Sequence, residues 1–198
     1  MITVKNASTG SAVQAEADQY GQLITLSQGG TLQTAATAGR LFSICNQAKV
    51  ATTANLATTW TGLGLVNPSG SGKNAIVHKF GWGMQIAADT AGAIGLMTAT
   101  DSGTTAASLT VQNCLDSSNI GTYIYATAGA TIGTPVLRRI YGDYGTEDTA
   151  TDNGTKGPHL VNLKGGLVIP PGRAVYTYST TATTACLVFH FVWEEVPE

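Results

Sequence analysis

The stretch that most resembles a motif with known chemistry is a glycine- and serine-rich run, residues 67–74. It comes close to a phosphate-binding loop. Such a loop reads G-x-x-x-x-G-K-[ST], because its glycine amides cradle phosphate oxygens and its hydroxyl holds magnesium. Gly72 and Lys73 match, but Asn67 replaces the first glycine and Asn74 replaces the hydroxyl residue. A strand pattern then follows, where a helix N-terminus would be needed to hold the anion. The run therefore predicts a hairpin turn and no nucleotide site.

The histidines and cysteines do not have the spacing of a metal site. Zinc needs three or four ligands brought together, and no H-x-x-x-H, H-E-x-x-H or C-x-x-C pattern occurs. We expect His78 and His190 to be hydrogen-bonded residues of the core or of an interface, and His159 to lie on a surface loop. We expect the three cysteines to be reduced and to act as small buried hydrophobic residues, as in a protein of a reducing compartment. They are Cys45, Cys114 and Cys186. No metal and no cofactor is expected.

Acidic residues gather in a polar stretch, residues 142–158, that predicts a long exposed loop. Two carboxylates could serve glycoside hydrolysis, and the same oxygen-rich loop could bind calcium or a host glycan. The simpler interpretation is that the acids keep the loop solvated. No G-x-S-x-G nucleophile motif occurs, so we predict no catalytic residue and no enzyme activity. The acids in question are Asp143, Glu147, Asp148 and Asp152.

Aromatic residues offer a further alternative, a platform on which sugars stack or a subunit interface. Tyr123 and Tyr125 would share one strand face, as would Tyr176 and Tyr178. We favour ordinary packing or interface burial for the whole set. Its other members are Trp60, Trp82, Tyr141 and Tyr144.

The elements that would position these residues read as strands. Polar and apolar residues alternate with period two over residues 74–86, which predicts a long strand in a half-buried sheet. We expect residues 93–98 to return from it as a hairpin, and residues 174–179 and 186–193 to form another. One face of the strand would carry Ile76, His78, Phe80, Trp82, Met84 and Ile86, and the other Ala75, Val77, Lys79, Gly81, Gly83 and Gln85.

Further short strands are expected along the chain, with turn residues between them. The last strand should be apolar on both faces, with Leu187, Phe189, Phe191 and Trp193 on one of them. Residues 31–39 fit either a short helix or a loop. Eight to ten strands without a long amphipathic helix predict an all-β fold, a jelly roll or antiparallel β-sandwich. The other expected strands are residues 22–26, 41–45, 59–66, 122–126, 136–141 and 167–169.

Composition supports a rigid β-rich building block. Thr, Ala and Gly make up 80 of the 198 residues, and charged residues are 11%. Threonine favours strands and glycine favours turns. A net charge of −2 with only 10 Lys and Arg leaves no basic footprint for nucleic acid. The chain has no apolar run long enough for a membrane span, and we expect no secretory signal.

Two stretches carry a family resemblance. Residues 60–74, Trp-Thr-Gly-Leu-Gly-Leu-Val-Asn-Pro-Ser-Gly-Ser-Gly-Lys-Asn, lead into the alternating strand, and residues 165–172, Gly-Gly-Leu-Val-Ile-Pro-Pro-Gly, precede the final strands. In these turn-and-strand signatures the chain resembles the capsid decoration (cement) proteins of tailed bacteriophages, which have a jelly-roll-like body. The resemblance implies a homotrimer on the outer surface of the phage head, over threefold or quasi-threefold positions, that clamps the major capsid protein. It implies location in the virion after synthesis in the host cytoplasm.

The first 20 residues are small and polar, and predict an extended arm ahead of a single β-sandwich domain over residues 21–198. Such an arm could order on a neighbouring subunit and enlarge the contact. We expect its apolar residues to bind the partner, namely Ile2, Val4, Val13 and Tyr20. The alternative function is a receptor- or carbohydrate-binding module of a phage fibre or tail. A hydrolase with a loop-borne acidic site ranks behind both.

Overall fold

The computed structural model divides the chain into two compact units, Met1–Thr34 and Ala35–Glu198. In the first unit, strands β1 (Thr3–Lys5) and β2 (Ala12–Gln14) form a two-stranded antiparallel sheet. The strand expected at residues 22–26 lies outside the described residues. The structure describes residues 3–5, 12–14, 31–86, 88, 90–100, 108–118, 122–145 and 158–198.

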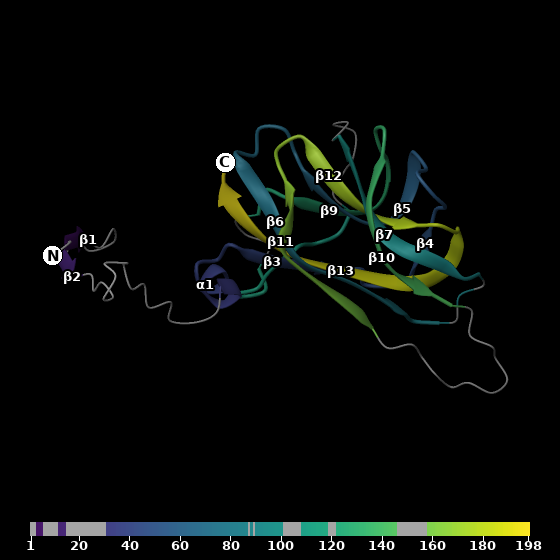
Figure 1. Ribbon diagram of the computed structural model, residues 1–198, viewed down its shortest axis with the longest axis horizontal. Coiled ribbons are helices and arrows are strands. Elements are labelled where there is room, and N and C mark those ends of the chain that lie inside the picture. Colours follow the sequence, from purple (N-terminus) through teal and green to yellow (C-terminus); the bar gives the residue numbers. More distant parts are fainter. Residues whose placement is uncertain are drawn as a thin grey trace, which may run out of the picture. The chain divides into compact units, whose positions relative to one another are not determined.

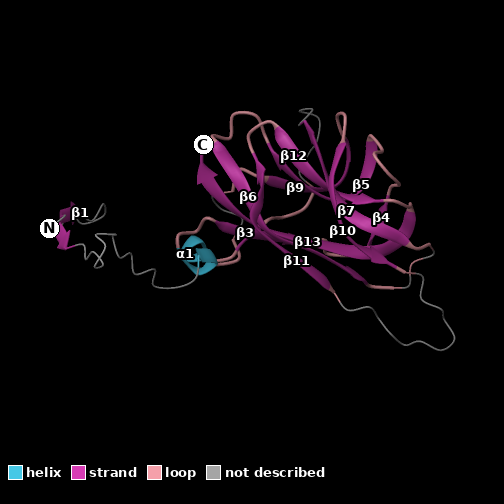
Figure 2. Cartoon of the chain, viewed as in Figure 1, coloured by secondary structure: helices cyan, strands magenta, loops and turns pink. Residues whose placement is uncertain are grey.

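A short helix, α1 (Thr31–Thr37), resolves the ambiguity that the sequence left at residues 31–39. Its end is capped by Gly39, whose φ of 69° lies in the left-handed region. The amides of Gly39 and Arg40 donate to the carbonyls of Ala36 and Ala35, each at 2.9 Å. Figure 2 shows α1 among strands and loops. Among the described residues, no helix has the length and apolar character that a membrane crossing requires.

The second unit is an antiparallel β-sandwich, as predicted (Figure 1). Sheet I has the strand order β10-β7-β12-β5-β9, and sheet II has the order β11-β6-β13-β3-β8, with β4 also pairing with β13. The bounds are β3 Leu41–Cys45, β4 Val50–Thr52, β5 Thr59–Asn67, β6 Lys73–Met84, β7 Gly92–Thr100, β8 Gln112–Asn113, β9 Tyr125–Thr131, β10 Val136–Tyr144, β11 His159–Ile169, β12 Arg173–Ser179 and β13 Thr183–Pro197.

Most consecutive strands of the sandwich alternate between the two sheets. From β5 to β9 and again from β10 to β13, each strand lies in the sheet opposite to the one before it. The predicted hairpins β6–β7 and β12–β13 are therefore wrong, because their members belong to different sheets. The strands themselves form as expected. A turn sequence shows where the chain reverses, but the burial of each strand's apolar face decides which sheet it joins.

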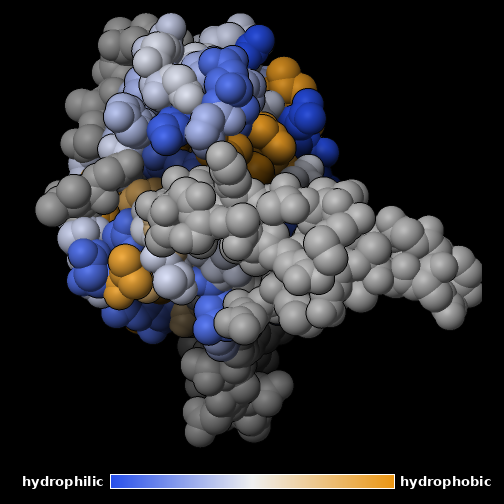
Figure 3. Space-filling model, turned by 90° about the vertical axis from the view of Figure 1, so that its left-hand side faces the viewer, coloured by the Kyte–Doolittle hydropathy of each residue, from blue (hydrophilic) through white to orange (hydrophobic). Residues whose placement is uncertain are grey.

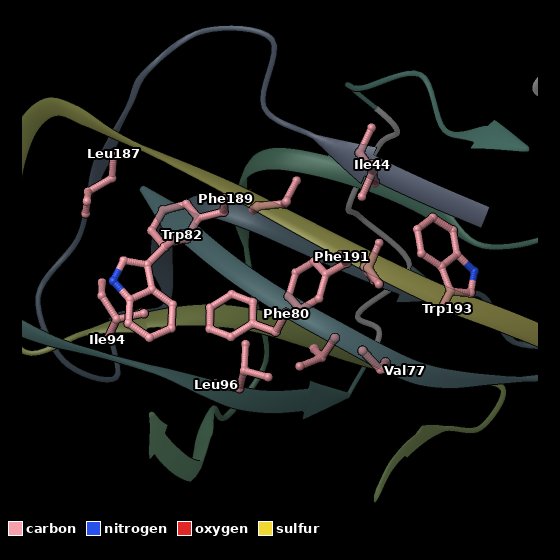
Figure 4. Packing of buried hydrophobic residues seen from close by; sticks show 14 of the residues in the cluster. Ile44, Val77, Phe80, Trp82, Ile94, Leu96, Leu187, Phe189, Phe191 and Trp193 are labelled. Carbon is pink, nitrogen blue, oxygen red and sulfur yellow. The ribbon is translucent and has the colours of Figure 1, made fainter. Parts of the chain in front are cut away.

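The core lies between the sheets and is rich in aromatic rings (Figure 4). Phe80 packs between Trp82 and Phe191, with ring centroids 5.5 and 5.2 Å away. Leu187, Phe189, Phe191 and Trp193 of β13 are all buried on this inner face, which confirms the predicted apolar face of the last strand. Because each large ring truncated to alanine costs ~3–5 kcal/mol, this row dominates the stability of the sandwich.

The predicted alternation of β6 is wrong at one point, because His78 forms a β-bulge. Val192 of β13 pairs with Lys79, and the next residue, Trp193, pairs with Val77, so His78 has no partner in this ladder. The extra residue reverses the faces on either side of it. The inner face therefore combines Ala75 and Val77 from one predicted set with Phe80 and Trp82 from the other.

A second apolar cluster covers the outer face of sheet I. Trp60 meets Tyr176 edge-on at 4.8 Å, and its indole Nε1 donates to the Thr177 carbonyl at 2.8 Å. The connection from β9 to β10 contributes Ile132, whose amide donates to Thr58 at 2.8 Å. A Cβ at Gly64 would overlap the Tyr176 ring, so glycine is needed there. Sheet I is consequently packed on both faces.

Candidate functional site

The four residues predicted to bind a partner all belong to the first unit. Val4 of β1 and Val13 of β2 occupy directly opposite register positions in the two-stranded sheet. Ile2 and Tyr20 lie outside the described residues. The structure thus places two of the four predicted residues together on one short hairpin.

The run at residues 67–74 is an arch between sheets rather than a hairpin turn. The Asn67 side-chain Nδ2 donates to the carbonyls of Lys73 at 2.7 Å and Ile169 at 2.8 Å. Its Oδ1 accepts from the Ser71 hydroxyl at 2.6 Å. Asn67, which stands where a phosphate loop has its first glycine, therefore holds the arch closed and ties it to β11.

The three histidines occupy different places. His78 lies at the bulge of β6, and the half-buried His190 covers Gly81 so closely that a Cβ there would overlap its ring. Burial, together with the positive charge of Lys79, lowers the pKa of His190 below its usual value of 6.5. His159 was expected on a loop. It instead begins β11, where it is the register partner of Trp82 on β6, and its ring stacks on the Trp82 ring at a centroid distance of 4.7 Å.

No disulfide joins the three cysteines, and only Cys186 is buried. The expectation of burial is wrong for Cys45 and Cys114. Cys45 ends β3 on the outer face of sheet II, and Cys114 follows β8 in a turn. Partial desolvation raises the pKa of the Cys45 thiol above its usual value. Among the described residues, no three His, Cys, Asp or Glu side chains gather as metal ligands would.

Most of the aromatic residues that could have formed a sugar platform are structural. Five of them are buried, as the packing interpretation predicted, and Tyr125 and Tyr141 are half-buried. Tyr123 is 54% exposed and lies under the Lys73 ammonium group, 5.7 Å from the ring centroid. The buried five are Trp60, Trp82, Tyr144, Tyr176 and Tyr178.

Most of the acidic residues considered for hydrolysis or calcium binding lie outside the residues that the structure describes. Asp143 is exposed on β10, which continues to Tyr144 and so takes the first part of the expected loop. Glu147, Asp148 and Asp152 lie outside the described residues.

Two buried carboxylates that were not among the predicted site residues, Glu194 and Glu195, lie near the end of β13. Because neighbouring strand residues point to opposite faces, Glu194 and Glu195 serve different partners. Glu194 is 8% exposed, and its Oε1 lies 3.1 Å from the Arg40 guanidinium. Its Oε2 lies 3.5 Å from His78 Nε2, a nitrogen that has no well-aligned hydrogen bond. The cluster links α1's end, the bulge and β13.

Glu195 is 3% exposed and holds the segment before β9. Its Oε1 accepts from the Thr122 hydroxyl at 2.7 Å and from the Ile124 amide at 3.4 Å, and its Oε2 accepts from the Tyr123 amide at 3.1 Å. These bonds satisfy a buried charge and fix an otherwise strandless segment. The sequence signal was available: two acids end an apolar strand.

The best candidate for a binding site is a groove of about 380 Å³ where the edge strands of the two sheets meet. Sheet I contributes the beginning of β10 and the facing ends of β7 and β12, and sheet II contributes the end of β11. We call it the arginine groove, because Arg138 and Arg173 both line it. Three threonines, Thr98, Thr100 and Thr134, add hydroxyl groups, while Val136, Leu167 and Pro170 supply apolar surface.

The charges of the arginine groove are not neutralised within the described residues. The ion pairs found there involve Glu194 with Arg40 and with His78, and neither groove arginine. A β-bulge between Leu137 and Arg139 leaves Arg138 out of the ladder with β7, and bulges re-aim side chains in this way. Two exposed guanidinium groups suit a carboxylate or a similar planar anion. The groove could not be predicted from the sequence, because Arg138 and Arg173 are 35 residues apart in the chain.

No family model, curated protein or solved structure matches the chain in comparisons with known proteins.

Proposed function

We propose that this protein is a structural component of a bacteriophage virion, without enzymatic activity, that binds the outer surface of the assembled capsid and stabilises it. The proposal includes a homotrimer at threefold or quasi-threefold positions and the major capsid protein as partner. It draws on the family resemblance in residues 60–74 and 165–172. The observation that supports it is the compact β-sandwich body, whose sheet I is packed on both faces.

A cement protein stabilises a shell by mass action, because it binds the assembled form and not its separated parts. Such binding needs a body that loses little conformational freedom when it docks. The packed aromatic rings of the core meet this need. So does the low content of long charged side chains, which would lose conformational freedom on docking. On the face drawn in Figure 3, hydrophobic residues form separate small patches among polar ones, which suits a protein that stays soluble before it docks.

Cosedimentation with expanded phage heads that lack their decoration protein tests the proposal, with the mass in solution measured alongside. We expect saturable pelleting with the heads, none with unassembled capsid protein, and the mass of a trimer. Absence of pelleting, or equal binding to assembled and unassembled subunits, would contradict the proposal. Binding on a glycan array without capsid binding would favour the fibre or tail module instead.

The arm has its own test. Deleting residues 1–20 should abolish attachment to heads while leaving the circular dichroism and melting temperature of the body intact, because the body is a separate compact unit. Unchanged occupancy on the heads would show that the arm, with Ile2, Val4, Val13 and Tyr20, is not the contact.

A further inference from the structure

We propose that the arginine groove binds an extended, carboxylate-bearing peptide segment of a partner protein. The inference deepens the proposed function, since it names the chemistry of the partner surface. It starts from Arg138 and Arg173, which line one groove and have no ion-pair partner among the described residues. Two like charges facing the same space repel each other, and a carboxylate between them turns that repulsion into attraction.

The groove is built to present these charges. Arg173 starts β12 in sheet I, where its backbone pairs with Asn67 on one side and Thr100 on the other. Arg138 reaches the groove from the β10 bulge. Its neighbour Arg139 does not line the groove; its guanidinium instead lies over the Tyr141 ring, 5.6 Å from the centroid. Adjacent arginines on one strand are thus divided between a structural contact and the groove.

The shape and lining favour a peptide over other anions. β10 is the edge strand of sheet I, so its outer row of backbone N–H and C=O groups has no strand partner among the described residues. An extended peptide can satisfy such groups and place alternate side chains into a neighbouring groove. Val136, Leu167 and Pro170 offer apolar contact to the side chains between the acids.

A sugar or a nucleic acid fits less well. None of the described residues that line the groove is aromatic, so neither sugar rings nor bases have a stacking partner there. Nucleic-acid backbones also need a longer track of cations than two arginines in a chain of net charge −2.

A peptide titration tests the inference in the absence of any capsid. The probe is a short capped peptide of alternating valine and glutamate, and its control has glutamine in place of glutamate. Binding is followed by calorimetry and by backbone amide shifts. We expect the acidic peptide to bind with shifts centred on Val136 and Arg138, and the neutral peptide to bind at least about tenfold more weakly.

The variants separate the groove from general charge. Arg138→Gln combined with Arg173→Gln should weaken binding about tenfold or more, whereas Arg139→Gln on the same strand should change it less than about twofold. All three side chains are exposed, so unchanged circular dichroism is expected. No binding of the acidic peptide, equal binding of the neutral one, or an equal loss in Arg139→Gln would each overturn the inference.

The test also distinguishes its failure from that of the proposed function. Peptide binding without pelleting on phage heads would support the groove as a peptide site and contradict the proposed capsid function. If the double arginine variant still pellets with phage heads and the parent protein binds no acidic peptide, the proposed capsid function would stand and the inference about the groove would be overturned. Binding of polygalacturonate, but not of the peptide, would overturn the inference in favour of an acidic glycan.

Discussion

Two of the few charged residues of this protein, Glu194 and Glu195, are buried carboxylates. The side chain of Glu195 accepts bonds from the hydroxyl and amides of residues 122–124 across the core. Removing it leaves the buried Ile124 amide, and the partly buried Thr122 hydroxyl and Tyr123 amide, without this acceptor, which costs more than the lost bonds alone.

We therefore predict that Glu195→Ala lowers the free energy of unfolding by ~1–3 kcal/mol, measured by urea denaturation. Glu198→Ala is the matched control, because Glu198 is an exposed acid at the same end of β13 and should stay within about 0.5 kcal/mol of the parent. Equal effects of the two variants would show that the hydrogen bonds from Glu195 to residues 122–124 do not stabilise the fold.

His190 predicts a pH dependence of stability. Burial, aided by the positive charge of Lys79, lowers the pKa of His190 in the folded state. On acidification, His190 is therefore protonated near pH 6.5 in the unfolded state, and only at a lower pH in the folded state. The stabilisation from neutral His190 is complete above pH 6.5, and is lost as the pH falls through 6.5 towards the lower folded pKa. Unfolding free energies of the parent should decline on acidification in this window, and those of His190→Gln should decline less. Identical slopes would contradict the assignment.

At the scale of the element, β6 depends on a glycine that makes room for a neighbour. A Cβ at Gly81 would overlap the His190 ring and come within 2.7 Å of the His159 carbonyl oxygen, whereas at Gly83 it would meet nothing closer than 3.8 Å. Gly81→Ala should cost ~1–3 kcal/mol, and Gly83→Ala on the same face should be close to neutral. Thermal unfolding of both variants checks this; a stable Gly81→Ala would mean that His190 can rotate away.

The elements also show how far sequence reasoning reaches. Strand positions such as residues 41–45 and 59–66 could be predicted, because local alternation and turn residues are written in the chain itself. Partner strands could not, because this sandwich pairs segments far apart in sequence. The His78 bulge could not be foreseen either: its cause is the fit of Val77 and Phe80 into the same core, a three-dimensional condition.

The candidate site was less predictable than the fold. Val4 and Val13 were chosen from the sequence, and the structure pairs their positions. Arg138 and Arg173 come together only when β10 and β12 are placed on either side of β7. Nothing local to either arginine indicates the groove.

The whole molecule makes a prediction through its three thiols. Cys186 is fully buried in the core, while Cys45 and Cys114 are exposed. A chromogenic disulfide reagent should therefore detect two thiols in the native protein and three after denaturation, with Cys45 slowed by its raised pKa. Replacing Cys45 and Cys114 with serine should leave a native protein that reacts only as it unfolds. Rapid reaction of that variant would contradict the compact body.

The central place of β13 has a consequence for how the chain folds. This strand is the last one in the sequence, yet it lies between β6 and β3 and supplies the middle row of the core. During synthesis the apolar surfaces of the earlier strands of sheet II stay uncovered until β13, which follows them in the sequence, leaves the ribosome. Pairing of this kind, between segments distant in sequence, makes folding slow. A nascent chain stalled before residue 183 should thus remain sensitive to protease, and become resistant only once β13 has emerged.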